Sequence, residues 1–400
     1  MRKLALALAL TLSAHAQTLP FLTDKDIAAI ASEVSGENAK RTVEGLSRHH
    51  RMRGSRGFRA AADQIVAELK RYGFEDARIE SLPADGTIFY GTQRSRPAWN
   101  ADFAELWELD ANGARSVRLA SWDAAPITLA QDSVSGEAMA DLVDVGAGTK
   151  ESDYAKDVRG RLVLTSSQPG QIAPLAIAKF GAAGIISYAQ NQRTAWYGED
   201  ENLVRWGHLE TFAPENQRTF AFMVSLRTAR ALQARLARGE TIRMHAVVRA
   251  GQEPGAYDIA TATIRGTEFP DEEIVYSCHL DHPRPGANDN ASGCATILEV
   301  ARTLSKAIAE KSIAPPKRTI RFVWPPEIEG TLALLNGRPE LAKRIRAAVH
   351  LDMVGGGPET KSIFHVTRGP ASLPSFVYDV GGPETKSIFH VTRGPASLPS

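Results

Sequence analysis

Two side chains that could bind a metal ion follow a predicted buried strand, and a third follows after a short loop. His279 and Asp281 are two positions apart, so at a strand end their side chains emerge on the same face. An imidazole that binds a metal through one nitrogen needs an acceptor at the other, and Asp281 can supply it. The loop then brings Asp289 to a predicted helix for which Ser292 is the expected N-cap. This spacing predicts a metal site; the alternative is a surface loop that only caps the helix.

Acidic residues also follow two further predicted strands. Glu327 and Glu329 come soon after a strand over 319–324, and Asp352 follows a strand over 347–351. Reacting groups of α/β sheets gather where the strands end. We therefore expect three strand ends to converge and to hold a divalent cation between an imidazole and carboxylates.

The residues around this site resemble a known family. The segment 278–293, read together with 351–353, is similar to the metal loop of the M28 family of zinc peptidases, which includes aminopeptidases and glutamate carboxypeptidases. The stretch 51–55 resembles the opening of the same domain. The short gap between His279 and Asp289 favours M28 over the related M20 peptidases. The resemblance implies an α/β fold with a mixed sheet flanked by helices, a peptide substrate and Zn²⁺ as cofactor.

The same resemblance implies a role for each site residue. His279 and Asp352 would hold one zinc ion, Asp289 would bridge it to a second, and Asp281 would orient His279. Two zinc ions at about 3.5–4 Å share a water molecule and lower its pKa. Glu327 would be the general base that takes the proton of this water and passes it to the leaving amine.

The sequence departs from the family pattern at two points. The family has adjacent glutamates, the first a base and the second a metal ligand, but here Ile328 stands in the ligand position. Glu329 could substitute for that ligand, although a step of two residues changes the direction of its side chain. The family's last ligand is a histidine well downstream, and His365 and His390 lie too close to Asp352 to be equated with it. The sequence thus predicts one zinc ion, and two if the second site is completed.

Three functions are compatible with these residues. The first is an exported zinc exopeptidase, most simply an aminopeptidase. The second is a peptidase-fold binding protein with impaired catalysis, which Ile328 would favour. The third is a single-zinc acyltransferase of the glutaminyl-cyclase type. Aminopeptidase versus carboxypeptidase activity, the residue preference at the cleaved bond and the oligomeric state stay open.

The chain divides by pattern into three parts. We expect a first peptidase segment over 17–124, an inserted domain over 125–250 and a second peptidase segment over 251–400. The insertion alternates short strands and helices. Its segments 160–164 (GRLVL) and 178–188 (AKFGAAGIISY) resemble the protease-associated domain, a substrate-access or interaction module. Another α/β insertion is the alternative.

The C-terminal part contains a repeated segment. Residues 356–375 recur letter for letter at 381–400. Natural structural repeats diverge, and a solenoid needs several copies to bury a core. The identical pair indicates an assembly error, a recent duplication or a truncated reading frame, so we assign no site residue to either copy.

Composition and the first residues bear on location and partners. The net charge of +1 gives no reason to expect nucleic-acid binding or a membrane-binding basic face. Residues 1–16 have the layout of a secretory signal peptide, with Arg2 and Lys3 before an apolar run. We expect a periplasmic or secreted protein with no membrane contact after cleavage. Cys278 and Cys294 could form a disulfide or be buried as thiols, and the sequence leaves both open.

Overall fold

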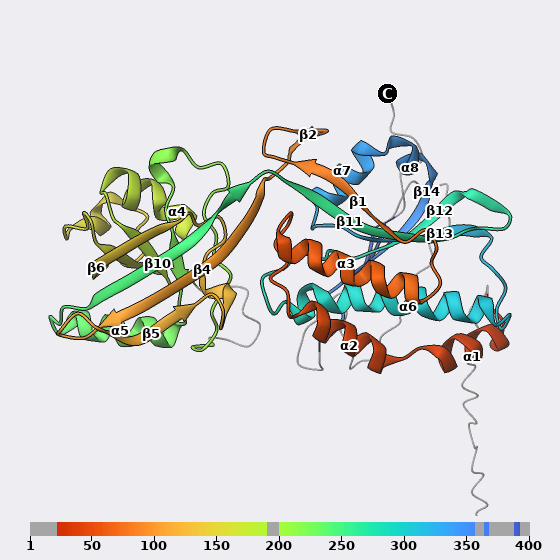
Figure 1. Ribbon diagram of the computed structural model, residues 1–400, viewed down its shortest axis with the longest axis horizontal. Helices are drawn as coiled ribbons and strands as arrows, with labels where there is room; N and C mark the ends of the chain where they lie inside the picture. The colour runs from red at the N-terminus through yellow and green to blue at the C-terminus, as the bar shows by residue number, and fades with distance from the viewer. Residues whose placement is uncertain (1–21, 190–199, 357–363, 368–387, 393–400) are drawn as a thin grey trace, which may run out of the picture.

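The computed structural model describes two stretches with their side chains and two short strands by their backbone alone: 22–189, 200–356, 364–367 and 388–392. The described residues form two lobes that lie side by side, and each is built on its own seven-stranded sheet (Figure 1). The expected signal peptide lies outside the described residues. None of the helices in the described part is long and apolar enough to cross a bilayer.

The sheet of the first lobe is mixed, as predicted. Its spatial order is β1 (Arg78–Ala84), β11 (Gly255–Ile264), β13 (Arg318–Trp324), β12 (Phe269–Ser277), β14 (Ile345–Asp352), β16 (Ile388–Thr392) and β15 (Phe364–Thr367). The central β12 is parallel to both β13 and β14, whereas β1, β11 and β13 pair antiparallel. The ends of β12, β13 and β14 therefore lie on one edge of the sheet, where parallel strands place functional residues.

Helices cover both faces of this sheet (Figure 1). One face carries α1 (Asp24–Glu33), α2 (Gly36–Leu46), α3 (Arg56–Arg71) and α6 (Gly293–Ala309); the other carries α7 (Glu329–Gly337) and α8 (Pro339–Arg344). The helix predicted after the Asp289 loop is α6, and α3 packs beside it. Their apolar stripes, with Ile65 and Ile297, pack on Phe322 and Trp324 of β13 in one buried core. This core fixes the start of α6 beside the strand ends.

The identical C-terminal segments each contribute a backbone strand to this sheet. β16 pairs antiparallel with β14, and β15 pairs parallel with β16. His365 and His390 belong to these strands, whose side chains lie outside the described part.

The second lobe has the sheet order β5 (Arg115–Ser121), β4 (Ala98–Leu109), β10 (Arg243–Glu253), β6 (Gly136–Asp144), β7 (Leu162–Thr165), β8 (Gly184–Ser187) and β9 (Ala221–Met223). Its helices are α4 (Pro169–Ala173) and α5 (Leu226–Ala237), and the short pair β2 (Phe89–Tyr90) and β3 (Gln93–Arg94) precedes it. Since β4 and β5 join this sheet, the lobe begins near Ala98 and is wider than the insertion expected over 125–250. β4 pairs with β10 across most of its length. The hydrophobic pattern of the β4 segment does not indicate a partner so far along the chain.

The two lobes are joined where β10 runs into β11 and where β4 begins. A Cβ added to Gly255 would stand 2.6 Å from the Ala98 side chain, so only glycine allows the two connections to approach this closely. The junction lies beside the strand ends of the first lobe (Figure 1).

Candidate metal centre

The three predicted ligands converge at the edge where β12 and β14 end. His279 Nε2 lies 3.1 Å from Asp289 Oδ1 and 3.5 Å from Asp352 Oδ1. One ligand atom from each of the three residues lies within 4.8 Å of the others. His279 follows β12, Asp352 ends β14, and Asp289 is in the turn that precedes α6. The predicted convergence of an imidazole and two carboxylates is therefore present.

Hydrogen bonds of Asn290 and the close approach of Gly293 hold the Asp289 turn against β14. The side-chain Nδ2 of Asn290 donates to the Leu351 carbonyl at 2.9 Å. Its side-chain Oδ1 accepts from the backbone N–H groups of Gly293 and Met353 at 3.0 and 3.2 Å. A Cβ at position 293 would meet the Leu351 carbonyl oxygen at 2.1 Å, so this close approach requires glycine. These contacts place Asp289 next to Asp352.

Ser292 occupies the N-cap position of α6, as expected, but its side chain does not cap the helix. Ser292 already has helical backbone angles, and its hydroxyl donates to the Asn288 carbonyl at 2.7 Å. The side chain of Asn290 takes the capping role for Gly293. The preceding turn, Ala287–Ser292, is not a regular helix, because the backbone of Asp289 and Asn290 has non-helical angles.

Asp281 lies directly behind the imidazole. The nearest acceptor to His279 Nδ1 is the backbone carbonyl of Asp281 at 3.0 Å, while the Asp281 carboxylate is 3.5 Å away. The carboxylate also accepts a hydrogen bond from the Glu327 backbone N–H at 2.6 Å and lies 3.7 Å from Arg53 Nε. Both the backbone carbonyl and the carboxylate of Asp281 therefore orient the His279 ring. With Nδ1 facing Asp281, Nε2 of His279 is directed at Asp289 and Asp352.

The electrostatics of the cluster favour a bound cation. Burial alone would lower the pKa of His279, but its contacts with Asp281, Asp289 and Asp352 outweigh burial and raise that pKa to about 12. Burial opposes ionisation of Asp289, yet His279 and His282 hold its pKa well below the usual range. The carboxylates therefore hold positive charge at the imidazole, which is the charge that a metal ion would supply.

Zinc fits the atoms that the site presents. Asp352 Oδ1 is buried and makes no hydrogen bond within the described ranges, although His279 Nε2 lies 3.5 Å away. A buried carboxylate oxygen without a donor is costly unless an ion completes it. One imidazole nitrogen and carboxylate oxygens are ligands that zinc accepts, with open positions for water or substrate.

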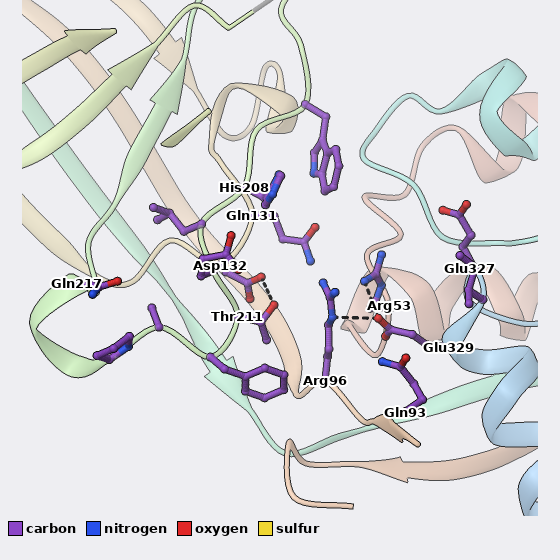
Figure 2. Close-up of a pocket in the computed structure, with 17 residues that line it drawn as sticks. Arg53, Gln93, Arg96, Gln131, Asp132, His208, Thr211, Gln217, Glu327 and Glu329 are labelled. Atoms are coloured by element: carbon purple, nitrogen blue, oxygen red, sulfur yellow. Dashed lines mark hydrogen bonds and ion pairs between the residues drawn. The ribbon is translucent and has the colours of Figure 1, made fainter. Parts of the chain in front are cut away.

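The two glutamates after β13 point in different directions (Figure 2). Glu329 is buried and turned to the lobe junction, where its carboxylate pairs with Arg53 Nη1 at 3.2 Å and Arg96 Nε at 2.9 Å and accepts from the Tyr257 hydroxyl at 3.0 Å. Glu329 is not among the three residues whose ligand atoms gather, so its expected role as a substitute ligand is corrected. The cause is the backbone at Ile328, which has φ 55° and turns the chain into α7.

Glu327 has the environment of a candidate base. Burial raises the pKa of its carboxyl group, and the charges of Asp281, Asp289 and Asp352 raise it further, against the opposing effect of His279. A carboxyl group that holds a proton more readily than usual is suited to accept one from water. Ile328 beside it exposes 65% of its surface and has only hydrocarbon to offer a metal.

Sequence reasoning missed two residues next to this cluster. His282 Nε2 lies 3.4 Å from Asp289 Oδ2. Arg51 is fully buried, and its guanidinium donates to the carbonyls of Leu280 and Gly286 at 2.8 and 2.9 Å. These hydrogen bonds stabilise the loop between β12 and the Asp289 turn. A charged residue in the Arg51–Ser55 stretch was visible in the sequence, but its buried position was not.

A cavity of about 630 Å³ opens between the lobes beside Glu327 (Figure 2). Arg53 and Arg96 line one side of it, while Gln131 and His208 of the second lobe face them. Gln131 Oε1 and His208 Nδ1 are buried atoms for which the described chain supplies no hydrogen-bond partner. Both lobes therefore contribute polar groups to one space next to the candidate base.

Comparison with known proteins is consistent with this geometry. Residues 260–392 match peptidase family M28. An aminopeptidase of Pseudomonas aeruginosa is 26% identical over 332 residues, which cover 78% of this chain and 55% of that protein. The chain thus spans about half the length of the curated relatives it matches.

Two solved structures share the fold. A peptidase M28 precursor from Shewanella amazonensis has a TM-score of 0.56 at 18% identity and covers 80% of this chain and 72% of its own. BSAP, a zinc aminopeptidase from Bacillus subtilis, has a TM-score of 0.53 at 19% identity and covers 80% of this chain and 69% of its own. The segment that matches peptidase family M28 includes His279, Asp289 and Asp352, and the two solved structures show that the chain shares their fold.

Proposed function

We propose that the chain is an exported zinc-dependent exopeptidase of the aminopeptidase type. The observation that carries this proposal is the convergence of His279, Asp289 and Asp352, with a buried Asp352 oxygen that makes no hydrogen bond in the described part of the chain. The aminopeptidases among its relatives and the zinc aminopeptidase that shares its fold support the same activity.

Each residue of the site has its own role in the proposed hydrolysis. His279, Asp289 and Asp352 would hold zinc, which when bound polarises a carbonyl group and acidifies a water molecule. Glu327 accepts a proton from the attacking water and returns it to the leaving amine, because its carboxyl group holds a proton more readily than an ordinary glutamate. Asp281 positions both His279 and Glu327, because its carboxylate contacts the His279 imidazole and accepts a hydrogen bond from the Glu327 backbone.

The cavity between the lobes is the proposed place of the peptide. It lies beside Glu327, and both lobes supply polar side chains to its walls. The second lobe would then act as the substrate-access module that its resemblance to a protease-associated domain implies. A peptide that spans this cavity would contact Arg96 on one side and Gln131 on the other.

Export is supported by the cysteines as well as by residues 1–16. Cys278 and Cys294 form a disulfide with their Cα atoms 5.3 Å apart. Disulfides form and persist in oxidising compartments such as the periplasm or the exterior. The pair joins the end of β12 to the start of α6, directly beside the proposed ligands.

A test of the proposed function uses short peptides with free or blocked ends. The zinc-loaded protein should release the first residue from a free amino terminus and leave an N-acetylated peptide intact. A chelator should stop release and zinc should restore it, while His279→Ala should stay inactive. Release from the carboxyl end instead, cyclisation of an N-terminal glutamine, or no reaction with zinc bound would each contradict the proposal.

A further inference from the structure

Ile328 is an apolar side chain that the fold exposes next to the candidate base. It exposes 65% of its surface, more than the other exposed large apolar residues of the described part. It lines the cavity between the lobes together with its neighbours Glu327 and Glu329 (Figure 2). A single exposed apolar residue is ordinary, whereas several around one cavity mark a binding surface.

The backbone holds Ile328 in this position against its own preference. Ile328 has φ 55°, in a region that β-branched residues rarely adopt. Both neighbours are anchored: the backbone N–H of Glu327 donates to the Asp281 carboxylate at 2.6 Å, and two arginines hold the Glu329 carboxylate. Backbone strain that the surroundings impose gathers at functional sites. The turn thus presents the isoleucine side chain to the cavity.

The second-lobe wall of the same cavity carries two further exposed apolar rings. Trp206 and Phe212 expose 37% and 43% of their surfaces, and both line the cavity. The Trp206 ring stacks on His208 with ring centres 4.9 Å apart, and the Arg94 guanidinium lies 3.8 Å from the centre of the Phe212 ring. Both rings are therefore held in place while part of their apolar surface stays open. Ligand cavities are lined in this way, with apolar and aromatic groups and a few polar ones.

The role of Glu327 relates this apolar surface to the reacting bond. Glu327 lines the cavity, whereas the described residues His279, Asp289 and Asp352 do not. In the proposed hydrolysis the three ligands hold the ion at the scissile carbonyl, and Glu327 returns the proton to the leaving amine. The cavity therefore extends from the leaving-amine side of the bond, where the second residue of the peptide lies.

We propose that Ile328, Trp206 and Phe212 bind the side chain of the second residue of the peptide and select an apolar one there. This inference rests on the proposed function, because it needs a peptide whose first residue is removed. Ile328 is the specificity-determining residue next to the base, and the two rings complete the apolar surface from the second lobe.

The test compares the initial release of the first alanine from Ala-Leu-Ala and from Ala-Ala-Ala by the zinc-loaded full chain. The wild type should have a kcat/KM at least about 10-fold higher for the peptide with leucine, the effect of one or more methylene groups in an apolar pocket. Ile328→Gly should lower this ratio by about 10-fold. Glycine adopts positive φ freely, so the variant removes the side chain and keeps the turn.

Two further variants separate the cavity from exposed apolar surface in general. Trp206→Ala changes the wall from the other lobe and should lower the same ratio. Val117→Ala is the matched control, because Val117 is also exposed but does not line the cavity, and it should keep the wild-type ratio. Calorimetric titration of Glu327→Gln with both peptides measures the preference as an affinity, without turnover. Adding Ile328→Gly to Glu327→Gln should weaken binding of Ala-Leu-Ala more than binding of Ala-Ala-Ala.

The same peptides show which part of the account fails. A wild type that does not distinguish the two peptides, or an unchanged ratio in both Ile328→Gly and Trp206→Ala, would overturn the inference and leave the proposed function standing. A change confined to the first position, seen with Leu-Ala-Ala and absent with Ala-Leu-Ala, would also overturn it. A zinc-loaded wild type that releases no first residue from any of these peptides would remove both.

Discussion

The carboxylate of Asp281 accepts a hydrogen bond from the backbone N–H of Glu327 at 2.6 Å. This bond joins the loop after β12 to the loop after β13. The same carboxylate lies 3.5 Å from the imidazole of His279. One buried charge therefore positions a metal ligand and the candidate base together.

Asp281→Asn tests this shared role. The amide keeps the size of the side chain but removes the negative charge next to the imidazole. We expect the affinity for the first zinc to fall by about 10–100-fold, the usual effect of changing a group behind a ligand. Competition with a chromophoric chelator measures it, with the exposed Asp102→Asn as control. Unchanged affinity would show that the carbonyl of residue 281 alone orients His279.

Glu327→Gln separates the base from the ligands. The amide cannot take a proton from water, so we expect turnover to fall by about 10²–10⁴-fold. Zinc content should stay at the wild-type value, because Glu327 is outside the group of gathered ligand atoms. Metal analysis of the same samples used for kinetics checks both expectations. Loss of zinc from this variant would make Glu327 a ligand instead.

Glu329→Gln should lower the stability of the fold, because Glu329 pairs with arginines and not with the metal. Its carboxylate is buried and pairs with Arg53 and Arg96, so its loss removes the nearer carboxylate from Arg53 and leaves it with Asp281 at 3.7 Å. We expect the free energy of unfolding to fall by about 3 kcal/mol, as for one removed partner of a buried pair. Urea unfolding measures the change, and zinc titration should show the wild-type number of ions. A lost zinc equivalent would restore Glu329 as a ligand.

Arg51→Lys tests the support beneath the loop. The fully buried guanidinium donates to the carbonyls of Leu46, Leu280, Pro285 and Gly286 at 2.7 to 3.2 Å. An ammonium group cannot reach all four, and unpaired buried carbonyls are costly. We expect a loss of roughly 3 kcal/mol in unfolding free energy. The half-exposed Arg59→Lys is the control, and an equal effect in both variants would contradict the account.

Removal of the disulfide should cost stability without removing the ligands. Cys278 and Cys294 are 16 residues apart, and a loop of that size contributes about 3 kcal/mol by restricting the unfolded chain. The double variant Cys278→Ala/Cys294→Ala should therefore melt at a lower temperature. A reductant should lower the melting temperature of the wild type and leave the double variant unchanged. Two free thiols in protein isolated from an oxidising compartment would contradict the pairing.

Much of the first lobe could be predicted from the sequence because its signals are local. Apolar strands followed by a polar residue placed His279 and Asp352 at strand ends, and parallel pairing of β12 with β14 then brought them together. The helical stripe of α6 likewise fixed where the Asp289 turn must end.

The remainder depends on contacts that are distant in the sequence. Glu329 is turned away by the backbone at Ile328 and captured by Arg53 and Arg96, neither of which is near it in the chain. The second lobe begins at Ala98 because β4 pairs with β10, which follows about 140 residues later. Disulfide formation likewise depends on how closely two Cα atoms approach in the fold.

The proposed function depends on His279, Asp289 and Asp352 binding one zinc ion together. It is tested most directly by anomalous X-ray diffraction from crystals grown with zinc, with data collected on both sides of the zinc absorption edge. We expect an anomalous peak at about 2.0–2.2 Å from His279 Nε2 and from one oxygen each of Asp289 and Asp352. An ordered loop with no peak there, or a peak held by other residues, would contradict it.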